Sequence, residues 1–122
     1  MLWYAASAIM YLKFKDDNQD IYPVWENVLL VQAETLEQAE EKAYSRARQD
    51  EGDSSSTITW NGRPATWVFA GLRKLIIVSH PDTENKELDC SEVTYSEFEI
   101  ASQDDFNSYV NGKDVRLLYC ED

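Results

Sequence analysis

A single histidine, His80, is the first candidate for catalytic chemistry, because histidine is the commonest general base in proteins. Cys90 follows ten residues later, so a Cys-His pair could form, and a Ser-His-Asp set is also possible from composition. No serine, however, stands in the Gly-x-Ser-x-Gly pattern of a nucleophile elbow. His80 also precedes Pro81 in a polar stretch, which favours an exposed loop histidine. We therefore predict no catalytic residue.

The acidic run from Asp16 to Asp20 partly matches a calcium-binding loop. It has acidic residues at the first and fifth positions and Asn18 at the third. The sixth position is Ile21 where the loop needs glycine, and the twelfth is Asn27 where it needs glutamate. The run therefore predicts a solvated hairpin tip, with weak cation binding as the alternative, and no metal site.

Paired acids such as Glu40-Glu41 could in principle act as a general acid and base. With 23 acidic residues in 122, however, neighbouring acids are expected by chance. The four glycines form no phosphate-binding loop or dinucleotide fingerprint. The sequence therefore predicts no cofactor.

The formal net charge of −12 is the strongest functional indication. It repels phosphate backbones and anionic lipids, so we expect neither nucleic acid nor a membrane as the direct target. A basic protein is the partner that this charge favours. The segment 82–99 holds seven acidic residues against Lys86, and Trp25 and Trp60 lie near predicted strand ends. The candidate interaction residues are Asp82, Glu84, Glu87, Asp89, Glu92, Trp25 and Trp60.

Two further features bear on the cellular compartment. Cys90 and Cys120 have no metal-ligand or redox spacing, which favours two reduced thiols, with a single disulfide as the alternative. The first twelve residues are almost wholly apolar but carry no positive charge before Lys13, unlike a signal peptide, and the run is too short to span a bilayer. We expect a buried strand and a cytoplasmic protein.

Step by step, the chain predicts strands joined in hairpins. Residues 3–14 are apolar on both alternating faces, as in a strand covered on both sides, and residues 24–33 follow a polar turn as the second strand of a hairpin. Asn61-Gly62 predicts a second hairpin between residues 57–60 and 65–70, with a bulge at Gly71 and an extended continuation over 75–78. Residues 92–100 and 115–119 complete the strands. A bulge near Ser96 would bring Tyr95 and Phe98 onto one face.

Two helices are predicted between these strands. Thr35 and Gln38 form a capping box for a helix over residues 36–49, whose inner stripe is Leu36, Ala39, Ala43 and Ala47. Ser102 caps a shorter helix that ends at Asn111-Gly112.

The element order is therefore β-β-α-β-β-β-α-β in a single domain over residues 1–122. Strands grouped in hairpins with few helices indicate an α+β fold, a mainly antiparallel twisted sheet with one long helix packed on it. One long helix cannot cover both apolar faces. The second face needs the C-terminal segment, a strongly curled sheet or another subunit, and we expect a homodimer.

Several residues together resemble a small bacterial family known only as a domain of unknown function. They are Trp3-Tyr4-Ala5-Ala6, the capped Ala-rich helix, Trp67-Val68-Phe69-Ala70-Gly71 and Glu92-Val93-Thr94-Tyr95-Ser96. The resemblance spans about residues 3–100, and this chain has a longer tail after Ser96. It implies a bacterial cytosolic domain and transfers no catalytic residue.

Two classes of function follow. The first is a non-catalytic protein-interaction module, in its specific form an inhibitor or immunity-type protein that neutralises a basic partner. The alternative is a small-molecule binding domain or enzyme, with a pocket at a dimer or sheet-helix junction lined by Trp and Tyr.

Overall fold

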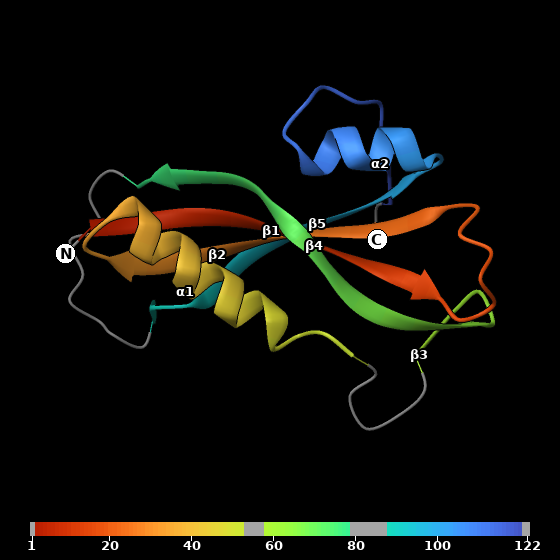
Figure 1. Cartoon of the computed structure of the whole chain (residues 1–122), viewed down its shortest axis with the longest axis horizontal. Coiled ribbons are helices and arrows are strands. Elements are labelled where there is room, and N and C mark those ends of the chain that lie inside the picture. The colour runs from red at the N-terminus through yellow and green to blue at the C-terminus, as the bar shows by residue number, and fades with distance from the viewer. Residues whose placement is uncertain (1, 53–57, 79–87, 121–122) are drawn as a thin grey trace.

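The computed structural model describes residues 2–52, 58–78 and 88–120, which form a sheet and two helices (Figure 1). The predicted order of elements is confirmed. The elements are β1 (Leu2–Phe14), β2 (Tyr22–Ala33), α1 (Leu36–Arg48), β3 (Ile58–Trp60), β4 (Arg63–Ile77), β5 (Ser91–Ile100), α2 (Gln103–Val110) and β6 (Leu118–Tyr119).

The described strands form one sheet in the order β3-β4-β1-β2-β5-β6, with every neighbouring pair antiparallel. β1 lies in the interior of the sheet between β2 and β4, as expected for the strand that is apolar on both faces. β4 is strongly bent and crosses the sheet obliquely in Figure 1. The predicted α+β class with a mainly antiparallel sheet is therefore correct.

α1 covers one face of the sheet, here called the α1 face. Thr35 caps the helix by accepting the backbone N–H of Gln38, as predicted. Ala39, Ala43 and Ala47 are fully buried against small side chains of β1, so the helix lies close to the sheet. Two expectations fail here. The helix has 13 residues and is short. Leu36 is exposed although it shares the phase of the alanine stripe, because it is the first residue of the helix and Ala39 is the first of the stripe to be buried.

α2 covers part of the opposite face, here called the α2 face. Its Phe106 and Tyr109 pack on Ile9 of β1, and Val115 and Leu117 of the C-terminal segment join this cluster. Ile9 alternates along β1 with the residues under α1, which places the two helices on opposite faces. The C-terminal segment, the first of the three covers expected from the sequence, thus covers part of this face.

The bulges differ in position from the sequence prediction. In β4 the register shifts on both sides of Gly71, whose φ of +140° is the left-handed conformation that glycine tolerates, so the bulge expected there is confirmed. In β5 the shift lies at Val93, between the pairs made by Thr94 and Glu92. The bulge expected near Ser96 is therefore wrong. Pairing is regular from Tyr95 to Ile100, so Tyr95 and Phe98 lie on opposite faces.

Candidate functional site

The structure separates the predicted interaction residues. Asp82, Glu84 and Glu87, together with His80, lie outside the described residues. Asp89 is engaged within the protein: its carboxylate accepts the backbone N–H of Gln32 at 2.7 Å and forms an ion pair with Lys42 of α1. Burial raises the pKa of Asp89, but these hydrogen bonds outweigh it and the pKa is lowered. Asp89 therefore ties α1 to the start of β5.

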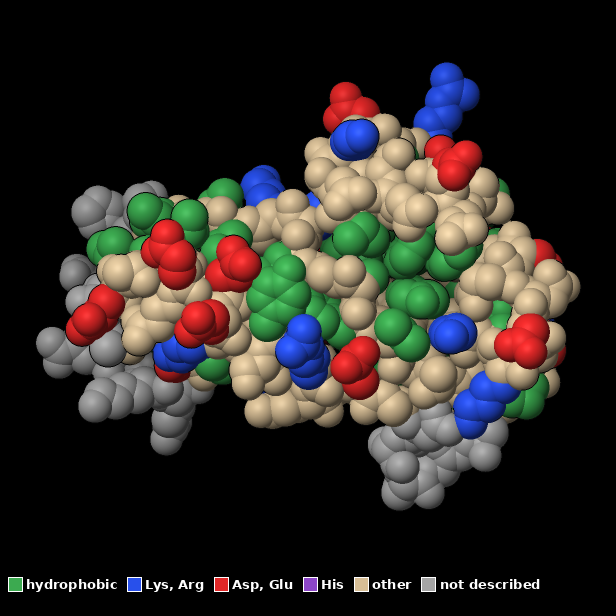
Figure 2. Space-filling view, in the orientation of Figure 1, with side chains coloured by type: hydrophobic (Ala, Val, Ile, Leu, Met, Phe, Trp, Pro, Cys, Tyr) green, Lys and Arg blue, Asp and Glu red, His purple; other side chains and the backbone are tan. Residues whose placement is uncertain are grey.

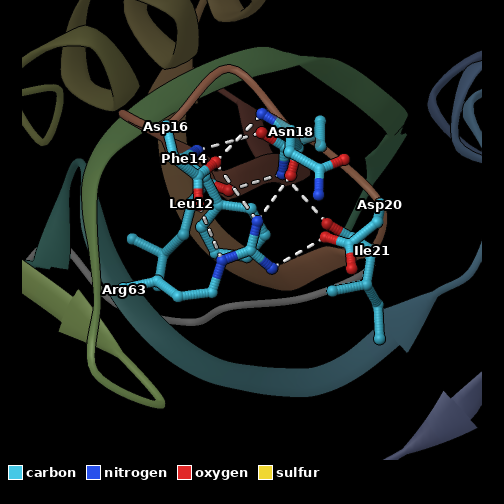
Figure 3. A network of polar contacts seen from close by, with 8 residues as sticks. Leu12, Phe14, Asp16, Asn18, Asp20, Ile21 and Arg63 are labelled. Atoms are coloured by element: carbon cyan, nitrogen blue, oxygen red, sulfur yellow. Dashed lines mark hydrogen bonds and ion pairs between the residues drawn. The ribbon is translucent and has the colours of Figure 1, made fainter.

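The acidic turn between β1 and β2 binds a cation that the chain itself supplies (Figure 3). The guanidinium of Arg63 donates to both carboxylate oxygens of Asp16 at 3.1 and 3.2 Å and to Asp20 at 2.7 Å. It also lies 3.7 Å from the centroid of the Phe14 ring. Within the turn, the Gln19 amide bonds to backbone groups of three residues and replaces missing strand hydrogen bonds. The acidic run that partly matches a calcium-binding loop is therefore a clasp, which joins the β1-β2 hairpin to the β3-β4 hairpin through Arg63. The sequence had predicted only a solvated hairpin tip.

Replacing Arg63 by glutamine should raise the pKa of both Asp16 and Asp20. Hydrogen bonds from Arg63 are the main cause that lowers each pKa. Because both are lowered, their contribution to stability is present above the unfolded value of about 4 and is lost as the pH falls through the folded pKa. Carboxyl-carbon NMR titration of wild type and variant measures the change. The pKa of Asp89, held by other partners, serves as the control. Unchanged Asp16 and Asp20 titrations in Arg63→Gln would contradict the clasp.

A cavity of about 650 Å³ opens on the α1 face where α1 ends. After the helix, the backbone N–H groups of residues 49–51 bond three residues back, which tightens the chain into a final turn. Gly52, at φ +100°, then exchanges two backbone hydrogen bonds with Trp67 of β4, and Glu51 accepts the N–H of Phe69. This stretch forms one wall of the cavity.

The floor and the facing wall of the cavity come from four strands. Met10, Trp25, Asn27 and Trp67 lie on the α1 face of β1, β2 and β4, and Glu92, Tyr95 and Glu97 come from β5. The rings of Trp25 and Trp67 meet edge to face, with centroids 4.7 Å apart. We call the cavity the aromatic pocket; its lining is Met10, Trp25, Asn27, Arg46, Gln49, Asp50, Glu51, Gly52, Trp67, Glu92, Tyr95 and Glu97.

The aromatic pocket is rich in carboxylates. Asp50 pairs with Arg46 at 3.0 Å, and Glu51 is held by the backbone of β4. The side chains of Glu92 and Glu97 have no hydrogen-bond or ion-pair partner in the described part of the chain. Arg46 is the basic residue of the lining, and it is also fixed by the carbonyl of Cys90. The pocket therefore presents unpaired negative charge beside exposed aromatic surface. Several separate acidic side chains also lie over the region of α1 in Figure 2, with Lys and Arg side chains near them.

The structure brings together two of the predicted residues, Trp25 and Glu92, in this pocket. Trp60 lies beyond the floor, in the apolar cluster that Trp25 and Trp67 share. Sequence reasoning missed Trp67, Tyr95 and Glu97 as site residues. One indication was available: Asn27 interrupts the otherwise apolar face of β2 made by alternate residues from Trp25 to Ala33. A polar residue at such a position marks where the helix stops covering the sheet.

Across 2–52, 58–78 and 88–120, no group of three or more His, Cys, Asp or Glu side chains is arranged to hold a metal ion. Cys90 and Cys120 form no disulfide with each other. No helix in the described part of the chain is long and apolar enough to cross a membrane.

Comparisons with known proteins agree with the resemblance noted in the sequence. A family model described as a domain of unknown function, DUF4288, matches residues 3–99. This range contains β1 to β5, apart from Leu2 and Ile100, and every residue that lines the aromatic pocket. α2 and β6 lie after the matched segment. No curated protein and no solved structure gave a significant match. With four-fifths of its length matched, the chain belongs to the DUF4288 family, a domain of unknown function.

Proposed function

We propose that this protein is a non-catalytic protein-interaction module whose contact surface is the aromatic pocket and its rim. The observation that carries the proposal is the pairing of Trp25 and Trp67 at the floor of an open cavity beside unpaired Glu92 and Glu97. Aromatic side chains in partly open pockets are the usual anchors of protein interfaces. Acidic charge around them speeds association with a basic partner and raises salt sensitivity.

The proposal keeps the specific form predicted from the sequence, an inhibitor or immunity-type protein that neutralises a basic partner in the cytoplasm. Cysteines that are not joined to each other fit a reducing compartment. It changes the expected contact, from the acidic segment 82–99 as a whole to the part of β5 that faces the pocket. A homodimer remains a prediction; Ile76 and Ile77, exposed at the end of β4 beyond the residues that pair with β3, are the apolar surface that would serve it.

Replacing Tyr95 by alanine should reduce recovery of the partner at least about tenfold, the loss typical of a moderate interface anchor. Tyr95 is 51% exposed on the pocket wall, so its removal changes the contact surface more than the fold. The measurement is a pull-down from native lysate at low and physiological salt, quantified by mass spectrometry. Tyr119→Ala is the matched control, because Tyr119 is 61% exposed on β6 and pairs with Phe98, whose side chain lies on the α2 face.

The proposal fails in either of two cases. One is that no protein is recovered stoichiometrically at either salt concentration. The other is that Tyr95→Ala and Tyr119→Ala retain the same protein to the same extent.

A small-molecule binding domain or enzyme is the second candidate. The cavity volume of about 650 Å³ is within the range of small-ligand sites, and the lining contains the Trp and Tyr side chains that this alternative requires. Native mass spectrometry of the purified protein tests it. A retained compound that Tyr95→Ala releases would favour this candidate over the interaction module.

A further inference from the structure

We infer that the aromatic pocket receives one arginine or lysine side chain from the partner protein. This inference rests on the proposed function and specifies the chemistry that the pocket recognises. It concerns the occupant of a single site, whereas the proposed function concerns the surface as a whole.

The charges around the pocket favour a cation. Four carboxylates, those of Asp50, Glu51, Glu92 and Glu97, share the lining with one guanidinium. Arg46 neutralises Asp50, and the backbone N–H of Phe69 occupies one oxygen of Glu51. Glu92 and Glu97 keep their full acceptor capacity within the described chain, so an incoming donor cation can pair with either carboxylate without breaking an existing ion pair.

The floor favours an apolar stem below that cation. Met10, Trp25 and Trp67 provide thioether and indole surface, and the exposed ring of Tyr95 stands at the side. Lysine and arginine bury their methylene stems against such surface while the charged end stays near polar groups. An aromatic face within about 6 Å also attracts the cation directly. An uncharged apolar side chain would leave both glutamates unused, and an acidic one would be repelled.

The chain contains its own example of this recognition. Arg63 lies over the Phe14 ring while Asp16 and Asp20 bind its guanidinium, with β1, the turn that follows it and β4 contributing to the clasp. There the cation that contacts the aromatic ring and the carboxylates comes from the protein itself. In the aromatic pocket the same combination, aromatic surface beside two carboxylates, faces outward.

Capped pentapeptides of the form Gly-Gly-Xaa-Gly-Gly are the probes, with Xaa as arginine, lysine, norleucine or glutamate. Binding to the intact protein is followed through the indole N–H resonances of Trp25 and Trp67. We expect saturable shifts with the arginine and lysine peptides. The norleucine peptide, which keeps the stem and lacks the charge, should bind at least about fivefold more weakly, and the glutamate peptide should cause no shift.

Glutamate-to-glutamine variants identify the carboxylates that bind the cationic peptide. Glu92→Gln and Glu97→Gln should each weaken the arginine peptide about threefold to tenfold. Glu41→Gln on α1 is the matched control, because it makes the same change in net charge away from the pocket lining, and it should leave the affinity unchanged. Equal binding of the norleucine and arginine peptides would overturn the inference. So would affinities that the Glu92 and Glu97 variants leave unaltered, or no saturation by concentrations on the order of 10 mM.

The two proposals fail separately. If Tyr95→Ala abolishes partner recovery but no cationic peptide binds, the interaction module is supported and the inference that a basic side chain occupies the pocket is wrong. If cationic peptides bind at the tryptophans but lysate yields no partner, the pocket chemistry stands and the protein-interaction function is wrong.

Discussion

Replacing Phe98 by alanine is expected to lower the free energy of unfolding by about 3–5 kcal/mol. Phe98 is 1% exposed on the α2 face, where its ring packs edge to face on Tyr109 at 4.9 Å and on Tyr119 at 5.8 Å. It therefore joins β5 to both α2 and β6. Truncation leaves a cavity that α2 cannot fill, because Phe106 and Tyr109 are already packed against Ile9 of β1.

Urea denaturation followed by circular dichroism measures this loss. Val93→Ala is the control on the same strand, because Val93 is 55% exposed at the bulge and its truncation should change stability by no more than about 0.5 kcal/mol. Equal losses for the two variants would mean that α2 does not depend on Phe98. In that case α2 would not cover the sheet through the cluster that contains Phe98.

The local elements were predictable because each has a short-range cause. Thr35 and Ser102 cap their helices as predicted, each by accepting the backbone N–H of the residue three positions on, and Asn61-Gly62 forms the expected tight turn at positive φ. α1 begins at the predicted residue and ends within one residue of the prediction. The apolar pattern of β1 indicated a strand covered on both faces, and the structure places it in the interior of the sheet.

The spatial arrangement was not predictable in the same way, because it depends on contacts between distant residues. The pairing of β1 with β4, and of β2 with β5, brings together segments separated by long stretches of chain. Whether Val93 or Ser96 carries the extra residue in β5 is decided by its partner strand β2. The position of α2 over the second face of the sheet likewise depends on where β5 lies, because α2 follows β5 and packs against it.

The candidate site shows the same division. Trp25 and Glu92 were identified from residue type and charge, which are local properties. Trp67 was assigned only to the second strand of the Asn61-Gly62 hairpin, and the end of α1 before Gly52 leaves its ring beside an open cavity. Asp89 was assigned to an exposed acidic surface, but Lys42, 47 positions earlier, neutralises it. Charge counting cannot distinguish an engaged carboxylate from a free one.

Replacing Tyr109 by phenylalanine should lower the free energy of unfolding by roughly 1.5–3 kcal/mol at neutral pH, the range for a hydrogen bond to a charged group. Tyr109 is 2% exposed, and its hydroxyl donates to the carboxylate of Glu26 on β2. Arg73 of β4 donates to the carbonyl of Tyr109 and lies 4.1 Å from the centre of its ring. The substitution keeps the ring packing and the Arg73 contacts but leaves the Glu26 oxygen without its donor.

The same contact predicts a specific loss of stability at alkaline pH. Burial is the main cause that raises the pKa of Tyr109, and the hydrogen bond to Glu26 raises it further. Because the pKa is raised in the folded state, the stabilisation is complete below the unfolded value of about 10 and declines as the pH rises above it. The slope for one group is about 1.4 kcal/mol per pH unit. Since Tyr109→Phe lacks this proton, its stability should approach that of wild type above pH 10.

Urea denaturation of both proteins between about pH 7 and pH 11 tests this expectation, within the range where the unfolded tyrosine begins to ionise. Tyr95→Phe is the control, because Tyr95 is exposed and its hydroxyl has no bonding partner in the described chain, so its difference from wild type should stay small across the range. A gap between Tyr109→Phe and wild type that stays constant through pH 11 would show that the Tyr109 hydroxyl titrates as it does in the unfolded chain. The stability gap would then have a cause other than the contact with Glu26, and α2 would be held on the sheet by ring packing and by the Arg73 contacts.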